Sequence, residues 1–266
     1  MISPNQKFKI FWDFLIIIII LSLFFIYPIE MSFDVNNFIL DTFLEDFVNL
    51  KLERILAIFL LLDILIRLFT SYYNKGLLIV KPKLIFRNYM KNDLIYDLIA
   101  YFPVIANGFI SISDDSALKP LFMYSKSLIF IKILKVIDVI RSLEEIIHFN
   151  DNGFAIFQLL KLIFAIFLFC NIMACLWYIT AFSSEDPLLN MIKIYKLEDK
   201  NWQTKYAKFL FVTVNAGKAD PQNNREMIFG FFALISTSGS MGFLISGIHN
   251  IMRVLGKSSQ QHRYFY

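Results

Sequence analysis

The chain has 266 residues, 57% of them apolar, with a mean hydropathy of +0.58. This composition excludes an ordinary soluble domain, and the length is sufficient for several membrane spans. The net charge is only +4, and the basic residues flank apolar runs. We therefore expect them to set membrane orientation and contact lipid headgroups, and we expect no nucleic-acid partner.

Uncharged or sparsely charged apolar runs predict six transmembrane helices, and hence an all-α membrane protein. The runs are 10–31, 55–69, 94–113, 121–140, 162–184 and 227–252. Crossing a bilayer core of about 30 Å takes roughly 20 predominantly apolar residues. The last two runs meet this length most clearly, whereas several of the others carry internal charges.

The loops between the runs predict the orientation in the membrane. The loop after the first run is acidic, and the loop after the second is rich in Lys and Arg. Because cytoplasmic loops are enriched in Lys and Arg, the amino terminus is expected in the cytoplasm. Six crossings return the carboxyl end to the same side. We therefore expect an integral protein of the plasma membrane with both termini cytoplasmic.

The segment between the last two runs carries the most specific motif. It reads Thr213, Val214, Asn215, Ala216, Gly217 and Lys218. This stretch resembles, without a gap, the potassium-channel selectivity filter Thr-Val-Gly-Tyr-Gly-Asp. An amphipathic stretch at 206–213 precedes it, which is typical of a re-entrant pore loop. The resemblance implies a two-helix pore domain with this loop at 149–252, after a four-helix voltage-sensor-like domain at 1–148.

Three further stretches resemble the second-to-third helix region of the cyclic-nucleotide-gated, hyperpolarisation-activated and ether-a-go-go channel superfamily. They are Leu62–Gly76, Lys83–Lys91 and Tyr96–Pro103. The resemblance implies a subunit of a tetrameric cation channel, in which residues 253–266 begin a cytoplasmic C-linker. A cyclic nucleotide is expected only if a nucleotide-binding domain follows Tyr266. We expect no other cofactor in this chain, and a permeant monovalent cation as its small ligand.

The fourth run carries the cations expected of a voltage sensor. They are Lys126, Lys132, Lys135 and Arg141, on a three-residue grid whose other points are Ile129 and Asp138. This spacing aligns along one side only if the helix tightens toward three residues per turn, and it spirals slowly otherwise. One charge crossing the full potential is worth roughly 2.3 kcal/mol per 100 mV. An array interrupted by Ile129 and Asp138 predicts a weak sensor.

Acidic residues in the second and third runs are the expected partners of these cations. Asp63, with Phe59 one turn earlier, and Asp97 would be costly in the membrane without a partner. By resemblance, Phe59, Asp63 and Asp97 form the gating-charge transfer centre. The alternative is that these acids and lysines hold the four helices together without moving.

Three replacements in the filter predict altered permeation. Asn215 stands for a Gly and tolerates a left-handed backbone, while Ala216 removes an aromatic side chain that packs behind the filter. Lys218 replaces an acid at the outer mouth. Four ammonium groups about 8 Å apart would repel one another by roughly 2 kcal/mol per pair at an effective dielectric near 20.

This repulsion disfavours a homotetramer and predicts a modulatory subunit that assembles with other channel subunits in a heterotetramer. The alternatives are a pore-forming subunit of a non-selective cation channel and a non-conducting structural component of a membrane complex. Lys218 would have no pore role if it turned to solvent.

The last run offers hinge candidates for a gate, and the chain offers no enzyme chemistry. Gly239 and Gly242 are the candidates, with close helix packing as the other interpretation. The three His residues are isolated and no nucleophile motif is present. We therefore expect neither a catalytic residue nor a metal site.

Overall fold

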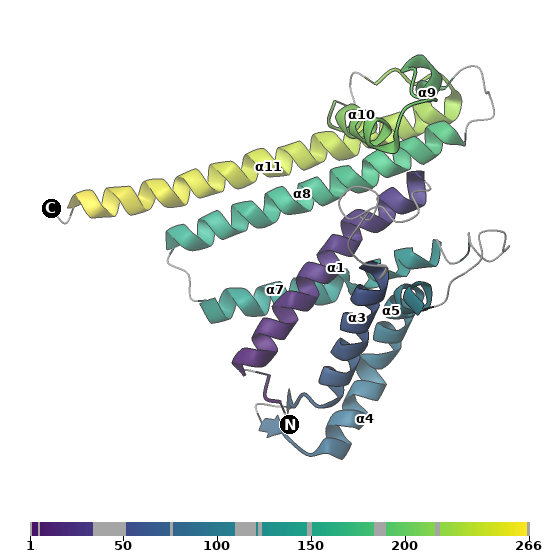
Figure 1. The fold of residues 1–266 in the computed structure, drawn as a ribbon. Coiled ribbons are helices and arrows are strands. Elements are labelled where there is room, and N and C mark those ends of the chain that lie inside the picture. The colour runs from purple at the N-terminus through teal and green to yellow at the C-terminus, as the bar shows by residue number, and fades with distance from the viewer. Residues whose placement is uncertain are drawn as a thin grey trace, which may run out of the picture. The chain divides into compact units, whose positions relative to one another are not determined.

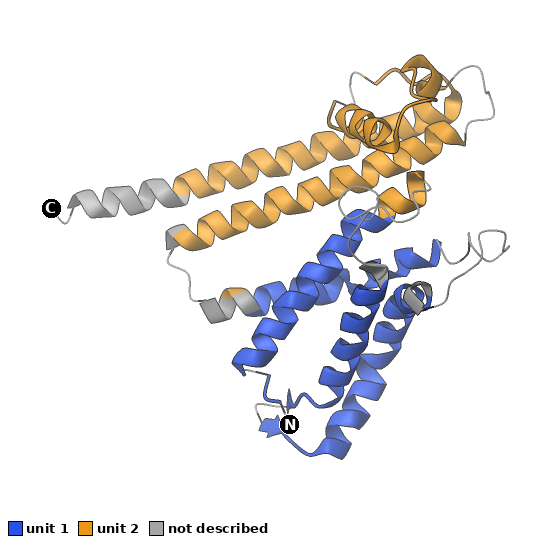
Figure 2. Ribbon diagram, viewed as in Figure 1, with its two compact units in different colours: residues 1–27, 36–143 blue, residues 28–35, 144–266 orange. Residues whose placement is uncertain are grey.

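The computed structural model describes residues 2–4, 6–33, 52–74, 77–109, 121, 124–147, 151–183, 190–215 and 219–264. The chain forms two compact units (Figure 2). The first comprises residues 1–27 and 36–143, and the second comprises residues 28–35 and 144–266. The predicted domain boundary at 148/149 lies outside the described residues, so it stays a prediction.

The first unit is a helical bundle (Figure 1). Its elements are the amino-terminal part of α1 (Lys7–Phe33), α3 (Leu52–Leu68), α4 (Pro82–Asn92), α5 (Leu94–Phe109), the 3-10 helix η1 (Lys126–Lys132) and most of α7 (Ile133–Ile147). α3 packs on α5, α5 packs on η1, and α4 contacts both α3 and α5. On α1, the Phe24 ring stacks on Phe130 of η1 at 4.8 Å between centroids.

A short hairpin follows α3 and was not predicted. Strands β1 (Tyr72–Asn74) and β2 (Leu77–Ile79) pair antiparallel, with Tyr72 opposite Ile79. The amino-terminal segment joins the same end of the unit, since Ile2 N donates to Phe69 O at 3.1 Å and Ser71 N donates to Ile2 O at 2.9 Å. The amino terminus, the hairpin and the end of α3 therefore lie together.

The second unit is built on two long helices. α8 (Asp151–Phe182) packs along α11 (Asn224–Tyr264), and the shorter α10 (Trp202–Val214) and α9 (Met191–Ile194) also contact α8. The core lies where α8, α9, α10 and α11 converge, around Trp177, Met191, Phe209 and Ala233. The Trp177 indole donates to the Met191 sulfur at 3.0 Å. This core fixes α10 against α8 and α11 near Trp177 and Ala233.

The helical class agrees with the prediction, and three described helices are long and apolar enough to cross a membrane. They are α1, residues 153–182 of α8 and residues 224–253 of α11. A shorter apolar helix runs from Leu94 to Ala106. α3, at 17 residues, falls below the same length criterion, so six crossings stay a prediction.

Two helices extend well beyond the predicted spans. α8 begins at Asp151, before the predicted start at 162, and α11 continues without a break to Tyr264, past the predicted end at 252. The predictions followed uncharged runs, whereas a helix can continue through charged residues once its backbone leaves the apolar layer.

Candidate functional site

Two fully buried carboxylates form the centre of the first unit. Asp63 lies on α3 and Asp97 on α5, and both have an exposed fraction of 0%. A buried carboxylate is stable only with a cation or several hydrogen-bond donors nearby. The structure supplies both kinds of partner.

Asp63 is held by one cation and two neutral donors. The Arg67 Nε donates to one carboxylate oxygen at 2.6 Å, and the Tyr101 hydroxyl donates to the same oxygen at 3.2 Å. The Trp12 indole of α1 donates to the other oxygen at 3.3 Å. These contacts join α1, α3 and α5 at one carboxylate.

Asp97 contacts two of the four cations of the predicted array. Lys132 forms an ion pair with Asp97 Oδ1, and the Lys135 Nζ lies 3.7 Å from the same oxygen. The Tyr89 hydroxyl of α4 donates to Asp97 Oδ2 at 2.6 Å, and Arg67 Nη1 lies 4.0 Å from that oxygen. Burial first, and then the bond to Asp97, raise the pKa of Tyr89 well above its ordinary value, so its hydroxyl remains a donor.

The backbone of the cation-bearing segment decides between the two geometries left open above. η1 is a 3-10 helix from Lys126 to Lys132, so residues three apart lie on one side, and Lys126, Ile129 and Lys132 are all buried. Lys126 lies over the Tyr27 ring at 5.1 Å, and Lys132 over the Tyr101 ring at 4.9 Å. The segment thus tightens where its cations are buried.

After Lys132, the positions of the three-residue grid no longer lie on the buried side, because the chain continues as the α-helix α7. The side chain of Lys135 is 28% exposed. The Arg141 side chain is 66% exposed and pairs with Asp138 of its own helix at 3.3 Å. The structure thus brings Lys132 and Lys135 to Asp97, places Lys126 on an aromatic ring, and leaves Arg141 in a local surface pair.

Four members of this cluster were not predicted as partners of the acids. Phe59 lies beside Trp12, with ring centroids 6.1 Å apart, while Trp12, Arg67, Tyr89 and Tyr101 all touch an acid. Arg67 could have been found, because it lies four residues after Asp63 on the same helix face. The other three donors lie on different helices from the acids that they contact, so no pattern within a single helix marks them.

The filter motif begins inside a helix. Thr213 is fully buried in α10 and its hydroxyl donates to Phe209 O at 2.9 Å, while Val214 is the last residue of that helix. Asn215 follows with φ −105° and ψ 41°. Ala216, Gly217 and Lys218 lie outside the described residues.

Asn215 therefore does not adopt the left-handed backbone that its side chain would tolerate. Because α10 continues to Val214, Asn215 caps the helix, and its own amide donates to Phe211 O at 3.1 Å. A side chain engaged in this way is turned back to the helix end.

Buried polar groups hold the chain on both sides of the filter-like motif. The Tyr206 hydroxyl of α10 donates to Asn171 Oδ1 of α8 at 2.7 Å, and Asn171 is fully buried. Glu226, also fully buried at the start of α11, accepts the backbone N–H of Met191 at 3.0 Å and that of Gln222 at 2.8 Å. One carboxylate thus ties α9 and the chain after the filter to α11.

The glycines of α11 differ in their surroundings. A Cβ at Gly239 or Gly242 would meet no heavy atom within 4 Å, whereas a Cβ at Gly247 would lie 2.3 Å from Leu162 Cδ2 of α8. α11 is one continuous helix through all three positions. Close helix approach therefore explains Gly247, and the hinge role of Gly239 and Gly242 stays a prediction.

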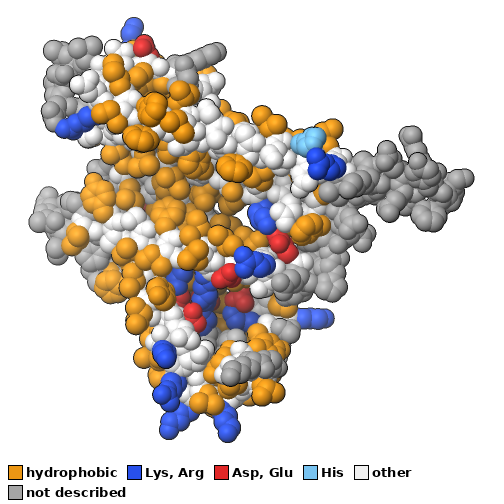
Figure 3. Space-filling model, turned by 180° about the vertical axis from the view of Figure 1, so that it is seen from behind, with side chains coloured by type: hydrophobic (Ala, Val, Ile, Leu, Met, Phe, Trp, Pro, Cys, Tyr) orange, Lys and Arg blue, Asp and Glu red, His pale blue; other side chains and the backbone are white. Residues whose placement is uncertain are grey.

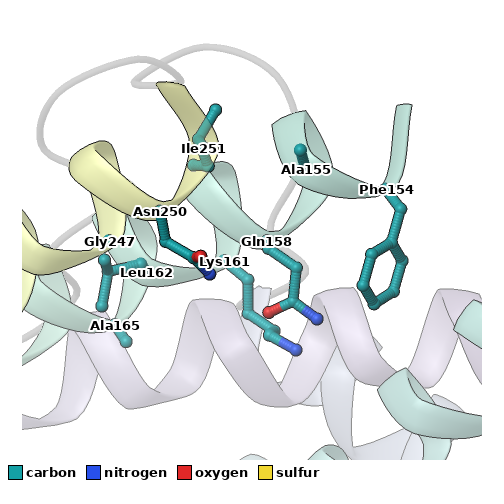
Figure 4. A pocket seen from close by; sticks show the side chains of 9 residues that line it. All are labelled: Phe154, Ala155, Gln158, Lys161, Leu162, Ala165, Gly247, Asn250 and Ile251. Carbon is teal, nitrogen blue, oxygen red and sulfur yellow. The ribbon is translucent and has the colours of Figure 1, made fainter. Parts of the chain in front are cut away.

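A cavity of about 800 Å³ opens between α8 and α11 near Gly247 (Figure 4). Its walls are mainly apolar, with Gln158, Lys161 and Asn250 as the polar lining residues. The ammonium of Lys161 pairs with Glu144 Oε1 at 2.6 Å.

The chain is similar in sequence to known ion transport proteins. The family model described as "Ion transport protein" matches residues 9–254. The chain is 28% identical over 190 residues to the voltage-gated delayed rectifier potassium channel KCNH5 of Homo sapiens, which covers 70% of this chain and 18% of the relative. It is 29% identical over 173 residues to KCNH1 of Rattus norvegicus, a channel of the same description, covering 64% and 16%.

A longer alignment joins the chain to the voltage-gated inwardly rectifying potassium channel KCNH7 of Mus musculus. The two are 24% identical over 277 residues, which covers 94% of this chain and 22% of the relative. The chain therefore spans less than a quarter of the length of these relatives.

The family match covers nearly the whole chain, including both units and the buried charge cluster. It confirms the expected resemblance to the voltage-gated-like channel superfamily. Together with the long apolar helices, it identifies an integral membrane protein of the channel class, and not an enzyme. The chain belongs to the ion transport protein family.

Proposed function

We propose that this chain is a voltage-sensing subunit of a tetrameric, potassium-channel-like cation channel, and that it acts as a modulatory member of a heterotetramer in the plasma membrane. The observation that carries the proposal is the pairing of Lys132 and Lys135 with the fully buried Asp97, in one unit of a chain whose other unit carries a filter-like motif. The relatives named above are voltage-gated potassium channels, which supports the same class.

The voltage-sensor role rests on the chemistry of the charge cluster. Lysines in a buried helix segment move with that helix, while Asp97 belongs to a different helix and offers an oxygen to more than one cation. Exchange of Lys132 for Lys135 at Asp97 would carry charge through the membrane field. With few cations in the array, the voltage dependence is expected to be shallow.

Assembly with other subunits is supported by the surface of α11. Only 11% of its most apolar 18-residue window is buried within the chain, and Ile228, Phe231 and Phe243 are more than 60% exposed. So much apolar surface on a helix needs lipid or neighbouring subunits to cover it. In a tetramer, α11 and the corresponding helices of the three other subunits would surround the central ion path.

The modulatory role rests on the motif from Thr213 to Lys218, where Ala216 and Lys218 stand in place of an aromatic residue and an acid. The chain should be expressed alone and together with a homologous voltage-gated potassium channel subunit. We expect no potassium-selective current from the chain alone, and altered conductance of the partner in the mixed assembly.

The decisive variant combines Asn215→Gly, Ala216→Tyr and Lys218→Asp. If the loop lines the pore, this variant alone should carry potassium-selective current. A non-selective current from the unmodified chain would favour the pore-forming alternative. A purified complex that holds the chain outside a four-membered ring would favour the structural alternative and end the channel-subunit proposal.

A further inference from the structure

Helix α4 combines three different side-chain stripes, each repeated every four residues. Ile85 and Tyr89 are buried against the bundle. Phe86 and Met90 form a second stripe and are 52% and 42% exposed. Residues four apart on a helix lie on one face, so the helix has one face for the protein and a separate apolar face for its surroundings.

The third stripe is basic. It consists of Lys83, Arg87 and Lys91, all exposed, and Lys81 is exposed just before the helix. Between residues 77 and 93 these four cations face a single acid, Asp93. Figure 3 shows Lys and Arg side chains gathered at the lower end of the first unit, with apolar side chains beside them.

The hairpin extends the apolar part of this surface. Leu77 is 74% exposed, Val80 is 49% exposed, and Leu84 at the start of α4 is 42% exposed. The surface lies between the end of α3 and the start of α5, which places it where the chain turns between two apolar helices. A basic stripe beside an apolar stripe at this position is typical of a helix that lies in the membrane interface.

We infer that the basic and apolar stripes of α4 form a binding surface for the phosphate-bearing headgroups of anionic phospholipids. Phe86 and Met90 reach toward the acyl region, and Lys83, Arg87 and Lys91 meet the phosphate and carboxylate groups. An acidic protein partner would satisfy the cations, but it gives no reason for a neighbouring apolar stripe. Charge complementarity together with that stripe favours lipid.

Each Lys or Arg close to an anionic membrane surface contributes roughly fivefold to affinity, so three contribute on the order of a hundredfold when all are engaged. The purified full chain should be titrated with dioctanoyl phosphatidylserine and, separately, with dioctanoyl phosphatidylcholine. Bound lipid is counted by native mass spectrometry. We expect at least a tenfold preference for phosphatidylserine, and we expect the preference to shrink as ionic strength rises.

The variant Lys83→Gln/Arg87→Gln/Lys91→Gln should lose at least ten times in phosphatidylserine affinity and keep its phosphatidylcholine affinity. A matched control removes three cations of the other unit, as Lys196→Gln/Lys200→Gln/Lys205→Gln, and should change affinity by less than twofold. If the triple α4 variant fails to fold, Arg87→Gln alone should lose roughly fivefold. The charge-conserving Lys83→Arg/Lys91→Arg should bind as the parent does.

The proposal fails if the α4 variants bind phosphatidylserine as tightly as the parent, or if the control loses as much. It also fails if inorganic phosphate at equal concentration displaces the lipid, because the apolar stripe then plays no part. If the true occupant is an acidic protein, the purified chain shows no lipid preference, and the proposal fails again. None of these readings needs ion current, so a failure here is separate from a failure of the proposed channel role.

Discussion

Both units bury carboxylates, but they neutralise them in different ways. In the first unit, Asp63 pairs with Arg67 of its own helix, and Asp97 pairs with Lys132 of η1. In the second, Glu226 faces two backbone N–H groups and no described lysine or arginine. A partner on a side chain can be exchanged, whereas a backbone donor is fixed by the fold.

The difference separates an adjustable network from an anchor. Asp97 has Lys132, Lys135 and Tyr89 within reach, so one partner can replace another without leaving the charge bare. Glu226 holds Met191 and Gln222 in a single geometry at the start of α11. The same chemical group therefore has several side-chain partners in one unit and two backbone partners in the other.

The largest expected effect tests the adjustable network. Asp97→Asn leaves the buried Lys132 without its counter-charge, and removing one partner of a buried ion pair costs about 3–5 kcal/mol. The free energy of unfolding should be measured by titration with a denaturing detergent in mixed micelles. Asp138→Asn, in the exposed pair with Arg141, should cost less than about 1 kcal/mol. Equal losses of unfolding free energy in the two variants would show that the buried network stabilises the fold no more than an exposed ion pair does.

The second test addresses the anchor. Glu226→Gln replaces a charged acceptor by an amide whose nitrogen cannot accept a backbone N–H, so we expect a loss of about 2 kcal/mol. Glu198→Gln in the same unit, where the side chain is 57% exposed, should stay within about 0.5 kcal/mol of the parent. A loss at Glu226 as small as that at Glu198 would contradict the anchor.

The third test addresses a hydrogen bond between two uncharged side chains of the second unit. Tyr206→Phe leaves the buried oxygen of Asn171 without this donor, and such a loss costs about 1–2 kcal/mol. Tyr96→Phe removes a hydroxyl from a side chain that is 59% exposed, and should be neutral. Hydrogen exchange of α10 amides should rise only in the first variant. Unchanged exchange would mean that other contacts alone hold α10.

The smallest effect concerns the glycines of α11. Gly239→Ala enters open space and should stabilise the helix by about 0.5–1 kcal/mol. Gly247→Ala has the same helical gain but pushes Leu162 aside, so its net effect should be lower than that of Gly239→Ala. Thermal midpoints of the two variants give the comparison. If Gly247→Ala were the more stable of the two variants, close packing against Leu162 would not explain the glycine at position 247.

The sequence predicted the elements that single-helix patterns encode. Apolar runs located the central parts of α1, α3, α8 and α11. The three-residue grid left two helix geometries open, and η1 has the tighter one, in which Lys126 and Lys132 share a face. The cost of a bare carboxylate in the membrane predicted cationic partners for Asp63 and Asp97. Asp97 pairs with two cations of the grid, whereas Asp63 forms its ion pair with Arg67 of its own helix. These inferences succeeded because each depends on periodicity or on the environment of one residue.

The sequence did not predict what depends on contacts between elements. The donors Trp12, Tyr89 and Tyr101 reach the acids from positions far apart in the chain or across helices. The hairpin at 72–79 is too short to leave a periodic signal. The backbone conformation of Asn215 was also not predicted. It follows from the position of Asn215 directly after the last residue of α10, and not from the tolerance of Asn for a left-handed backbone.

The 3-10 geometry of η1 has a mechanical consequence. A 3-10 helix rises about 2.0 Å per residue and an α-helix about 1.5 Å, so relaxing the seven residues of η1 to α would shorten the segment by about 3.5 Å. The six steps from Lys126 to Lys132 would also turn one lysine relative to the other by about 120°. A screw displacement of this size arises within η1 itself, so its two lysines can change neighbours while α7 keeps its place.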